Sequence, residues 1–323
     1  MNKIQTKALV EGAIFASITV VIGIIRFYVP IVALISIVWS VPTILIAFRH
    51  GLKVSINSVV VSSVLVAVLT QPIEGLGFFI GFGLPGIIMG YLLKKKLNPW
   101  KTIFITGIVL ALCSVLSFYL GMLAIGVDIV KAYDDLFIEI KNAYREAVDS
   151  MAGMMGVGRE EILKGTENFE KSLDMMKLIL PGGILASAIV ISFVNFKLTR
   201  LALKRIKYSI ENVKPFSLWK LSDKGVLTII LVLLLTGVEM YLLKLPQLHA
   251  LTMNIITIAT LLFTILGLSV AKFFLDKYSV PKALKVIIMF FLLVSFSNIA
   301  MIAGVLDMLF NFRKLEDNPV SYG

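Results

Sequence analysis

The sequence predicts an all-α fold, a multi-pass bundle of about nine membrane-spanning helices. Two observations lead to this prediction, and the first is composition. Of the 323 residues, 58% are hydrophobic and only 16% are charged, whereas about a quarter of the residues of an ordinary soluble protein are charged. The mean hydropathy is +0.94. A soluble chain of this length could not bury so much apolar surface, so we expect the lipid bilayer to be its solvent.

The second observation is a series of apolar runs, most of them near the ~20 residues that a helix needs to cross the hydrocarbon core. The runs occupy residues 8–29, 31–48, 51–70, 76–93, 102–126, 178–199, 225–243, 248–271 and 284–306. The second and third runs are short for a crossing and could be tilted or partly re-entrant. Pro30, Pro42 and Pro85 interrupt or kink helices in the first half of the chain.

The net charge of +11 follows from lysines and arginines at the ends of the apolar runs. The positive-inside rule explains such residues, so we expect no nucleic-acid partner. The basic clusters lie at 3–7, 49–53, 94–101, 197–224 and 272–285. If every run crosses the membrane, all of them fall on one side. The N-terminus is therefore predicted to be cytoplasmic, and nine crossings would place the C-terminal tail outside.

The segment 127–176 has a different character. It holds 11 of the chain's 20 acidic residues and only six Lys or Arg. Tyr133, Phe137, Ile140 and Tyr144 share one helical face, and glycines at 153–158 then break the pattern. We expect an extracytoplasmic acidic helical hairpin between the fifth and sixth runs. It is either a lid or partner-docking element, or an amphipathic hairpin that lies on the bilayer or on the bundle.

This hairpin and the basic stretch that follows the sixth run divide the chain into three parts. Residues 1–200 are predicted to form a transmembrane core that carries the hairpin at 127–176. Residues 201–224 form a basic cytoplasmic linker, in which each Lys or Arg near anionic lipid contributes about 1 kcal/mol. Residues 225–323 form a C-terminal transmembrane unit.

Small residues recur at helical spacing in two of the runs. Ala8, Gly12 and Ala16 form one strip on the first run. Such a strip lets a second helix approach closely, either within this chain or on a separate membrane subunit. The fourth run contains Gly77, Gly81, Gly86 and Gly90 around a proline. These glycines either permit tight packing or expose backbone groups of a broken helix to a ligand.

Ionisable residues inside apolar runs are few. Arg26 lies near the outer end of the first run, Glu74 opens the fourth, and Glu239 lies in the outer third of the seventh. They either form an outer polar pocket for a small molecule or pair and snorkel at the interface.

Signatures of catalysis and metal binding are missing from the sequence. There is no HExxH, GxSxG or P-loop motif, a single cysteine, and two histidines at run ends predicted to lie on opposite sides. We therefore expect no enzyme, no catalytic residue, no metal and no cofactor. Active transport would need energising partner subunits.

The first hundred residues resemble the S components of energy-coupling factor transporters. The shared features are the strip Ala8, Gly12 and Ala16, a proline-bearing second run that ends at a positively charged turn before Gly51, and a glycine-rich fourth run that ends in lysines. The resemblance implies a six-helix core that binds a small molecule, with the strip facing an energising membrane subunit. Typical S components end after six spans and lack a long acidic hairpin.

Over nearly its full length the chain resembles the YybS-like family of predicted multi-pass membrane proteins, a domain of unknown function. This resemblance implies a place in the bacterial cell membrane. Two functions compete. The first is small-molecule binding or a transport-related role through the S-component-like core. The second is a structural or regulatory scaffold that binds membrane or other protein partners through the acidic hairpin and the basic cytoplasmic loop.

Overall fold

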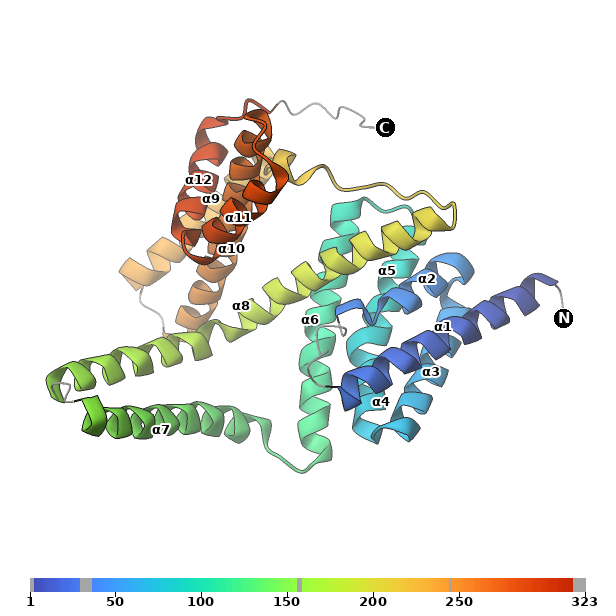
Figure 1. Ribbon diagram of the computed structural model, residues 1–323, viewed down its shortest axis with the longest axis horizontal. Coiled ribbons are helices and arrows are strands. Elements are labelled where there is room, and N and C mark those ends of the chain that lie inside the picture. The colour runs from blue at the N-terminus through green and yellow to red at the C-terminus, as the bar shows by residue number, and fades with distance from the viewer. Residues whose placement is uncertain (1–2, 30–36, 156–158, 244–245, 316–323) are drawn as a thin grey trace. The chain divides into compact units, whose positions relative to one another are not determined.

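The structure is a computed structural model that describes residues 3–29, 37–155, 159–243 and 246–315. Every regular element in these residues is helical, so the predicted all-α membrane fold is confirmed. The elements are α1 (Lys3–Tyr28), α2 (Val41–His50), α3 (Leu52–Leu69), α4 (Pro72–Phe78), η2 (Phe79–Gly83), α5 (Leu84–Lys94), α6 (Pro99–Ala124), α7 (Ile129–Met155), α8 (Arg159–Arg205), η3 (Phe216–Leu218), α9 (Asp223–Val238), η4 (Glu239–Leu243), α10 (Pro246–Lys277), α11 (Lys282–Val294) and α12 (Ser297–Phe310) (Figure 1).

Seven helices of the described residues are long and apolar enough to cross a membrane, or eight if one bent pair counts as a span. The predicted count of nine is not confirmed, for two reasons. The run 31–48 holds α2, which has 10 residues and is only about 15 Å long. The run 284–306 divides into α11 and α12, which are bent by 97° at the break between them.

The chain forms two compact units, which are described separately. Unit 1 comprises Met1–Leu173 and Ser187–Val213, and unit 2 comprises Asp174–Ala186 and Lys214–Gly323. Helix α8 contributes to both units.

The core of unit 1 is built around Trp39, whose side chain is 1% exposed. Its indole nitrogen donates a 2.9 Å hydrogen bond to the Thr19 carbonyl of α1, and its ring lies 4.9 Å from those of Phe78 and Phe82. A Cβ at position 23 would come within 2.8 Å of this ring, so Gly23 makes the space that the indole fills. The centre of unit 1 is therefore packed with side chains.

The strip of small residues on α1 faces α3 inside unit 1. Ala8, Gly12 and Ala16 are buried. The hydroxyls of Ser58 and Ser62 on α3 donate hydrogen bonds of 3.1 and 3.5 Å to the carbonyls of Gly12 and Ala16. Small side chains permit this close approach, since larger ones would hold the two helices apart. The chain's own α3 therefore occupies the strip.

Two glycines of α5 lie against α2. A Cβ added at Gly90 would come 2.5 Å from the Cβ of Ala47, and one added at Gly86 would come 3.0 Å from Thr43. The contact at Gly90 is closer than real Cβ atoms show and the one at Gly86 is tighter than most of them, so α2 and α5 approach each other closely here.

The other two glycines of this span face α6 with more room. A Cβ at Gly77 or Gly81 would lie 3.5 or 3.9 Å from the Ser117 hydroxyl, which is ordinary van der Waals contact. The four glycines predicted as one set thus serve two different helix contacts.

The acidic hairpin consists of α7 and the first part of α8, which run alongside each other (Figure 1). The rings of Tyr144 and Phe169 stack with centroids 3.7 Å apart, and Phe137 is buried. Arg145 donates a 2.6 Å hydrogen bond to Glu170 across the pair. The apolar faces of the two helices therefore cover one another.

In unit 2, α10 and α12 cross at two glycines. A Cβ added at Gly267 would overlap the Ala300 carbonyl, and one added at Gly304 would overlap the Phe263 carbonyl. The backbones therefore touch at this crossing, as small residues allow for helices in lipid.

Helix α8 contains Pro181, which removes one hydrogen bond from the helix ladder. The side chain of Asn254 on α10 fills the break. Its amide oxygen accepts a 2.5 Å hydrogen bond from the Gly182 amide, and its amide nitrogen donates a 2.9 Å bond to the Leu178 carbonyl. Backbone groups at membrane depth need such partners, because no water replaces them.

Candidate anion-binding cavity at the basic end of unit 1

At the end of unit 1 where α1 finishes, Arg26 and Glu74 form an ion pair. The guanidinium of Arg26 also lies 5.2 Å from the centroid of the Trp39 ring. The structure thus brings together two of the three residues predicted for an outer polar pocket, and the positive charge there is matched. Glu239, the third, belongs to unit 2. It is 6% exposed in the π-helical turn η4.

The opposite end of unit 1 collects the basic residues. Glu11 of α1 accepts a 2.8 Å ion pair from Arg49 and a 2.7 Å contact from the His50 ring nitrogen. Lys94, at the end of α5, lies beside Gly51, since a Cβ added there would come within 3.2 Å of the Lys94 Nζ. Two basic clusters that are distant in sequence, 49–53 and 94–101, thus share one end of unit 1 with Glu11, as their alternation along the chain predicts.

A cavity of about 510 Å³ opens at this basic end. It is lined by Phe48, Arg49, Leu93, Lys94, Lys96, Leu97, Pro99, Phe196, Tyr208, Ser209, Ile210 and Glu211. Four parts of unit 1 contribute to the lining: the end of α2, the turn between α5 and α6, the last third of α8, and the segment just after it. The Phe48 and Tyr208 rings meet edge to face at 5.6 Å, which joins two of these parts.

Helix endings fix the shape of the cavity. Two residues after the end of α5, Lys96 has a φ of 55°, and the Leu97 amide donates to the Leu92 carbonyl. Two residues after the end of α8, Lys207 has a φ of 65°, and the Tyr208 amide donates to the Leu203 carbonyl. These are Schellman turns, which reverse the chain sharply after a helix. Both turns therefore direct the following residues along the cavity wall.

The charges of the cavity wall are unbalanced. Lys94 and Lys96 have no hydrogen-bond or ion-pair partner among the described residues. The Nη atoms of Arg49 bind Glu11, but its buried Nε has no partner there. Glu211 is the one acidic residue in the lining. The cavity therefore offers donors and positive charge to a ligand, and half of its lining residues are apolar.

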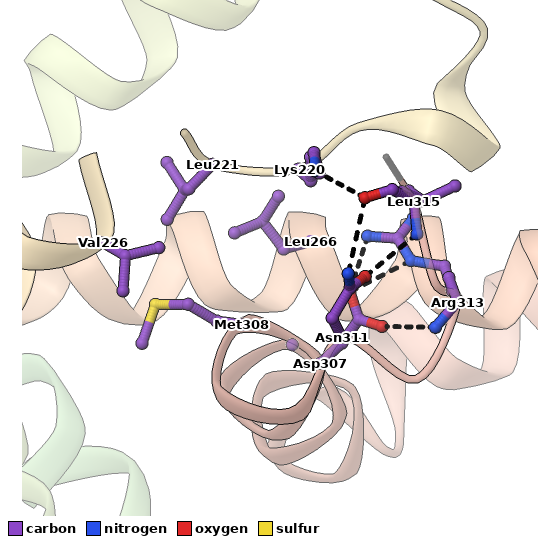
Figure 2. Close-up of a pocket in the computed structure, with 10 residues that line it drawn as sticks. Lys220, Leu221, Val226, Leu266, Asp307, Met308, Asn311, Arg313 and Leu315 are labelled. Atoms are coloured by element: carbon purple, nitrogen blue, oxygen red, sulfur yellow. Dashed lines mark hydrogen bonds and ion pairs between the residues drawn. The ribbon is translucent and has the colours of Figure 1, made fainter. Parts of the chain in front are cut away.

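Unit 2 holds a second, smaller pocket of about 290 Å³, beside a buried arginine (Figure 2). The Arg313 side chain donates to Asp307 at 2.8 and 3.0 Å, to the Ser269 hydroxyl at 2.8 Å, and to the carbonyls of Ser217 and Trp219 at 2.8 and 2.7 Å. All the donors of its guanidinium are used within the protein.

The remaining cation of this pocket is also engaged, because Lys220 donates a 2.7 Å hydrogen bond to the Leu315 carbonyl (Figure 2). The pocket therefore has no spare positive charge for a ligand. Its residues come from the segment before α9, from α9, α10 and α12, and from the segment after α12. Of these two pockets, the basic cavity of unit 1 has the unpaired charges that a binding site needs.

No group of three or more His, Cys, Asp or Glu is placed to hold a metal ion in the part of the chain that the structure describes.

Comparison with known proteins fits this membrane architecture. The sequence model of the family described as "Predicted membrane protein (DUF2232)" matches residues 17–308. The chain belongs to this family. It is also 30% identical over 316 residues to the "Uncharacterized protein YybS" of Bacillus subtilis (strain 168), which covers 96% of this chain and 98% of that protein. No solved structure matches the chain.

The DUF2232 family membership confirms the predicted YybS-like resemblance and the membrane location of the chain. The likeness of the first six spans to S components stays a prediction. The sequence of this DUF2232 protein did not predict the cavity. In the sequence, Arg49, Lys94 and Lys96 indicate only a predicted cytoplasmic side, and the segment 208–211 carries no motif. The available signal was three consecutive lysines after a glycine-rich span.

Proposed function

We propose that this DUF2232 protein is a binding protein of the bacterial cell membrane that holds a small anionic molecule in the basic cavity of unit 1 and catalyses no reaction itself. The observation that carries the proposal is the pair of unpaired lysines, Lys94 and Lys96, on the wall of a 510 Å³ cavity whose lining is also partly apolar. Ligand sites commonly combine an apolar lining with a few convergent polar groups.

Charge supports an anion over a cation. The lining contains two lysine charges, Lys94 and Lys96, and one carboxylate, Glu211, while the charge of Arg49 is balanced by its ion pair with Glu11. The wall therefore has one positive charge in excess. A structural role for the lysines is the competing explanation, since cations stabilise the negative ends of helices such as α5.

Lys95 separates these two explanations. It follows the same helix end, but it lies over the Tyr91 ring at 5.7 Å and does not line the cavity. If the lysines only stabilise the helix end, replacing Lys95 should have the same effect as replacing its neighbours.

The test is thermal unfolding of the purified protein in detergent with inorganic phosphate, glycerol phosphate, short-chain phosphatidylglycerol and, as a cationic control, choline. A ligand at 100 times its Kd stabilises the folded state by about 2.7 kcal/mol. We expect at least one anion, and not choline, to raise the melting temperature of the wild type. The Lys94→Gln/Lys96→Asn variant should lose the shift, whereas Lys95→Gln/Lys101→Gln should keep it. Asparagine is chosen because it tolerates the left-handed backbone at position 96. No shift with any anion, or equal losses in both variants, would refute the proposal.

A further inference from the structure

The surroundings of the cavity indicate which anion it binds. We infer that the occupant is the phosphodiester headgroup of an anionic phospholipid from the adjoining leaflet. This inference rests on the proposed function and specifies its ligand.

The position of the cavity along the spans is the first argument. Helix α5 ends at Lys94 and α6 begins at Pro99, so the cavity lies at the ends of two predicted membrane spans. In its lining Arg49 lies over the Tyr208 ring at 5.9 Å, and Lys95, which separates the cavity residues Lys94 and Lys96 in the sequence, lies over the Tyr91 ring. Aromatic side chains and long cations are enriched where acyl chains meet headgroups. The cavity is therefore at the depth of lipid phosphates.

The lining is the second argument. Its apolar part consists of Phe48, Leu93, Leu97, Pro99, Phe196 and Ile210. A free phosphate ion keeps its hydration shell and gains nothing from such a wall, whereas the glycerol and upper acyl carbons of a lipid release apolar surface from water. A cavity whose lining combines basic and apolar side chains therefore favours an amphiphile.

The third argument is the path for acyl chains. Leu201 on α8 and Ile206 just after it are 53% and 41% exposed, and the cavity residue Tyr208 is 45% exposed. Leu201 and Ile206 lie between the cavity residues Phe196 and Tyr208 in the sequence, so this stretch of unit 1 presents an apolar surface. The chains of a bound lipid can follow this surface into the bilayer while the headgroup stays in the cavity.

The amount of charge is the fourth argument. One unmatched positive charge on the wall balances a phosphodiester, which carries a single negative charge, better than a phosphate monoester with nearly two. Among membrane lipids this selects an anionic diester such as phosphatidylglycerol over zwitterionic phosphatidylcholine, whose choline would meet the lysines.

The experiment is native mass spectrometry of the full-length protein released from phosphatidylcholine nanodiscs that contain graded amounts of phosphatidylglycerol. We expect phosphatidylglycerol to bind at least fivefold more tightly than phosphatidylcholine. The Lys94→Gln/Lys96→Asn variant should bind it about 25-fold more weakly than wild type, at about fivefold per lysine. The Lys95→Gln/Lys101→Gln variant removes the same charge from outside the cavity wall and should bind as the wild type does.

Each other outcome overturns the inference in a distinguishable way. Equal binding of the two lipids, or equal losses in the two variants, would mean that no headgroup site exists in the cavity. If free glycerol phosphate binds the wild type as tightly as the lipid does, the anion site of the proposed function stands and the lipid inference fails. If neither glycerol phosphate nor any lipid depends on Lys94 and Lys96, both fail.

Discussion

The crossing of α10 and α12 predicts a large effect from a single methyl group. In Gly304→Ala the new Cβ would overlap the Phe263 carbonyl and come within 2.8 Å of the Gly267 amide nitrogen. Both are backbone atoms, so no side-chain rotation relieves the contact. The two helices must move apart, and the close packing around the crossing is lost.

The magnitude follows from two opposing effects. Alanine is favoured over glycine inside a helix by about 1 kcal/mol. Overpacking of a well-packed contact costs roughly 1–3 kcal/mol, and a backbone contact belongs at the upper end of that range. We therefore expect Gly304→Ala to destabilise the folded protein by about 2 kcal/mol.

The matched control is Gly237→Ala on α9 of the same unit, where a Cβ would meet nothing within 4 Å. It should leave stability unchanged or raise it by up to about 1 kcal/mol, through helix propensity alone. The assay is denaturation in mixed micelles followed by circular dichroism, with both variants compared with the wild type. If Gly304→Ala unfolds at the same denaturant fraction as Gly237→Ala, the backbone contact at the crossing does not exist.

Three further predictions use the same assay or simple labelling. Asn254→Leu leaves the Gly182 amide and the Leu178 carbonyl of α8 unpaired, and it should destabilise the folded protein by about 2–4 kcal/mol. The control is Thr257→Val, which should change stability little because the Thr257 hydroxyl bonds a carbonyl of its own helix at 2.8 Å. Equal effects of the two substitutions would refute the role of Asn254 in joining α8 to α10. Asp307→Asn leaves the buried guanidinium of Arg313 without its counter-ion and should destabilise the folded protein by about 3–5 kcal/mol. Asp276→Asn, which breaks an exposed ion pair with Lys285, should unfold like the wild type. Similar losses of stability in the two variants would contradict this account. On a Cys113→Ser background, the Ser222→Cys variant and a variant with a cysteine added at the C-terminus should react with a membrane-impermeant thiol reagent from the same side of the membrane. The reason is that Lys220 binds the Leu315 carbonyl. Labelling from opposite sides would support the nine-crossing topology instead.

The sequence alone determined the solvent and the class of fold. Apolar content and the length of the apolar runs are local properties of the sequence. An apolar segment in lipid folds as a helix, because a helix hydrogen-bonds its backbone groups within the segment itself. The small residues of α1 and α5 were also visible, because a strip at four-residue spacing depends only on helix geometry. What touches each strip was not visible. Gly86 and Gly90 meet α2, whereas Gly77 and Gly81 face α6.

Tertiary structure decided how the charges pair and where a ligand can bind. The sequence allows Arg26 to pair with Glu74 or with Glu239, and in the structure it pairs with Glu74. The cavity gathers the end of α2, the turn after α5 and the segment 208–211 from more than 150 residues of chain. Lys94 and Lys96 look the same in sequence whether they mark a membrane side or line a cavity. The difference lies in which neighbours the fold brings within reach, because an ion pair or a cavity depends on distances of a few ångströms that local patterns do not encode.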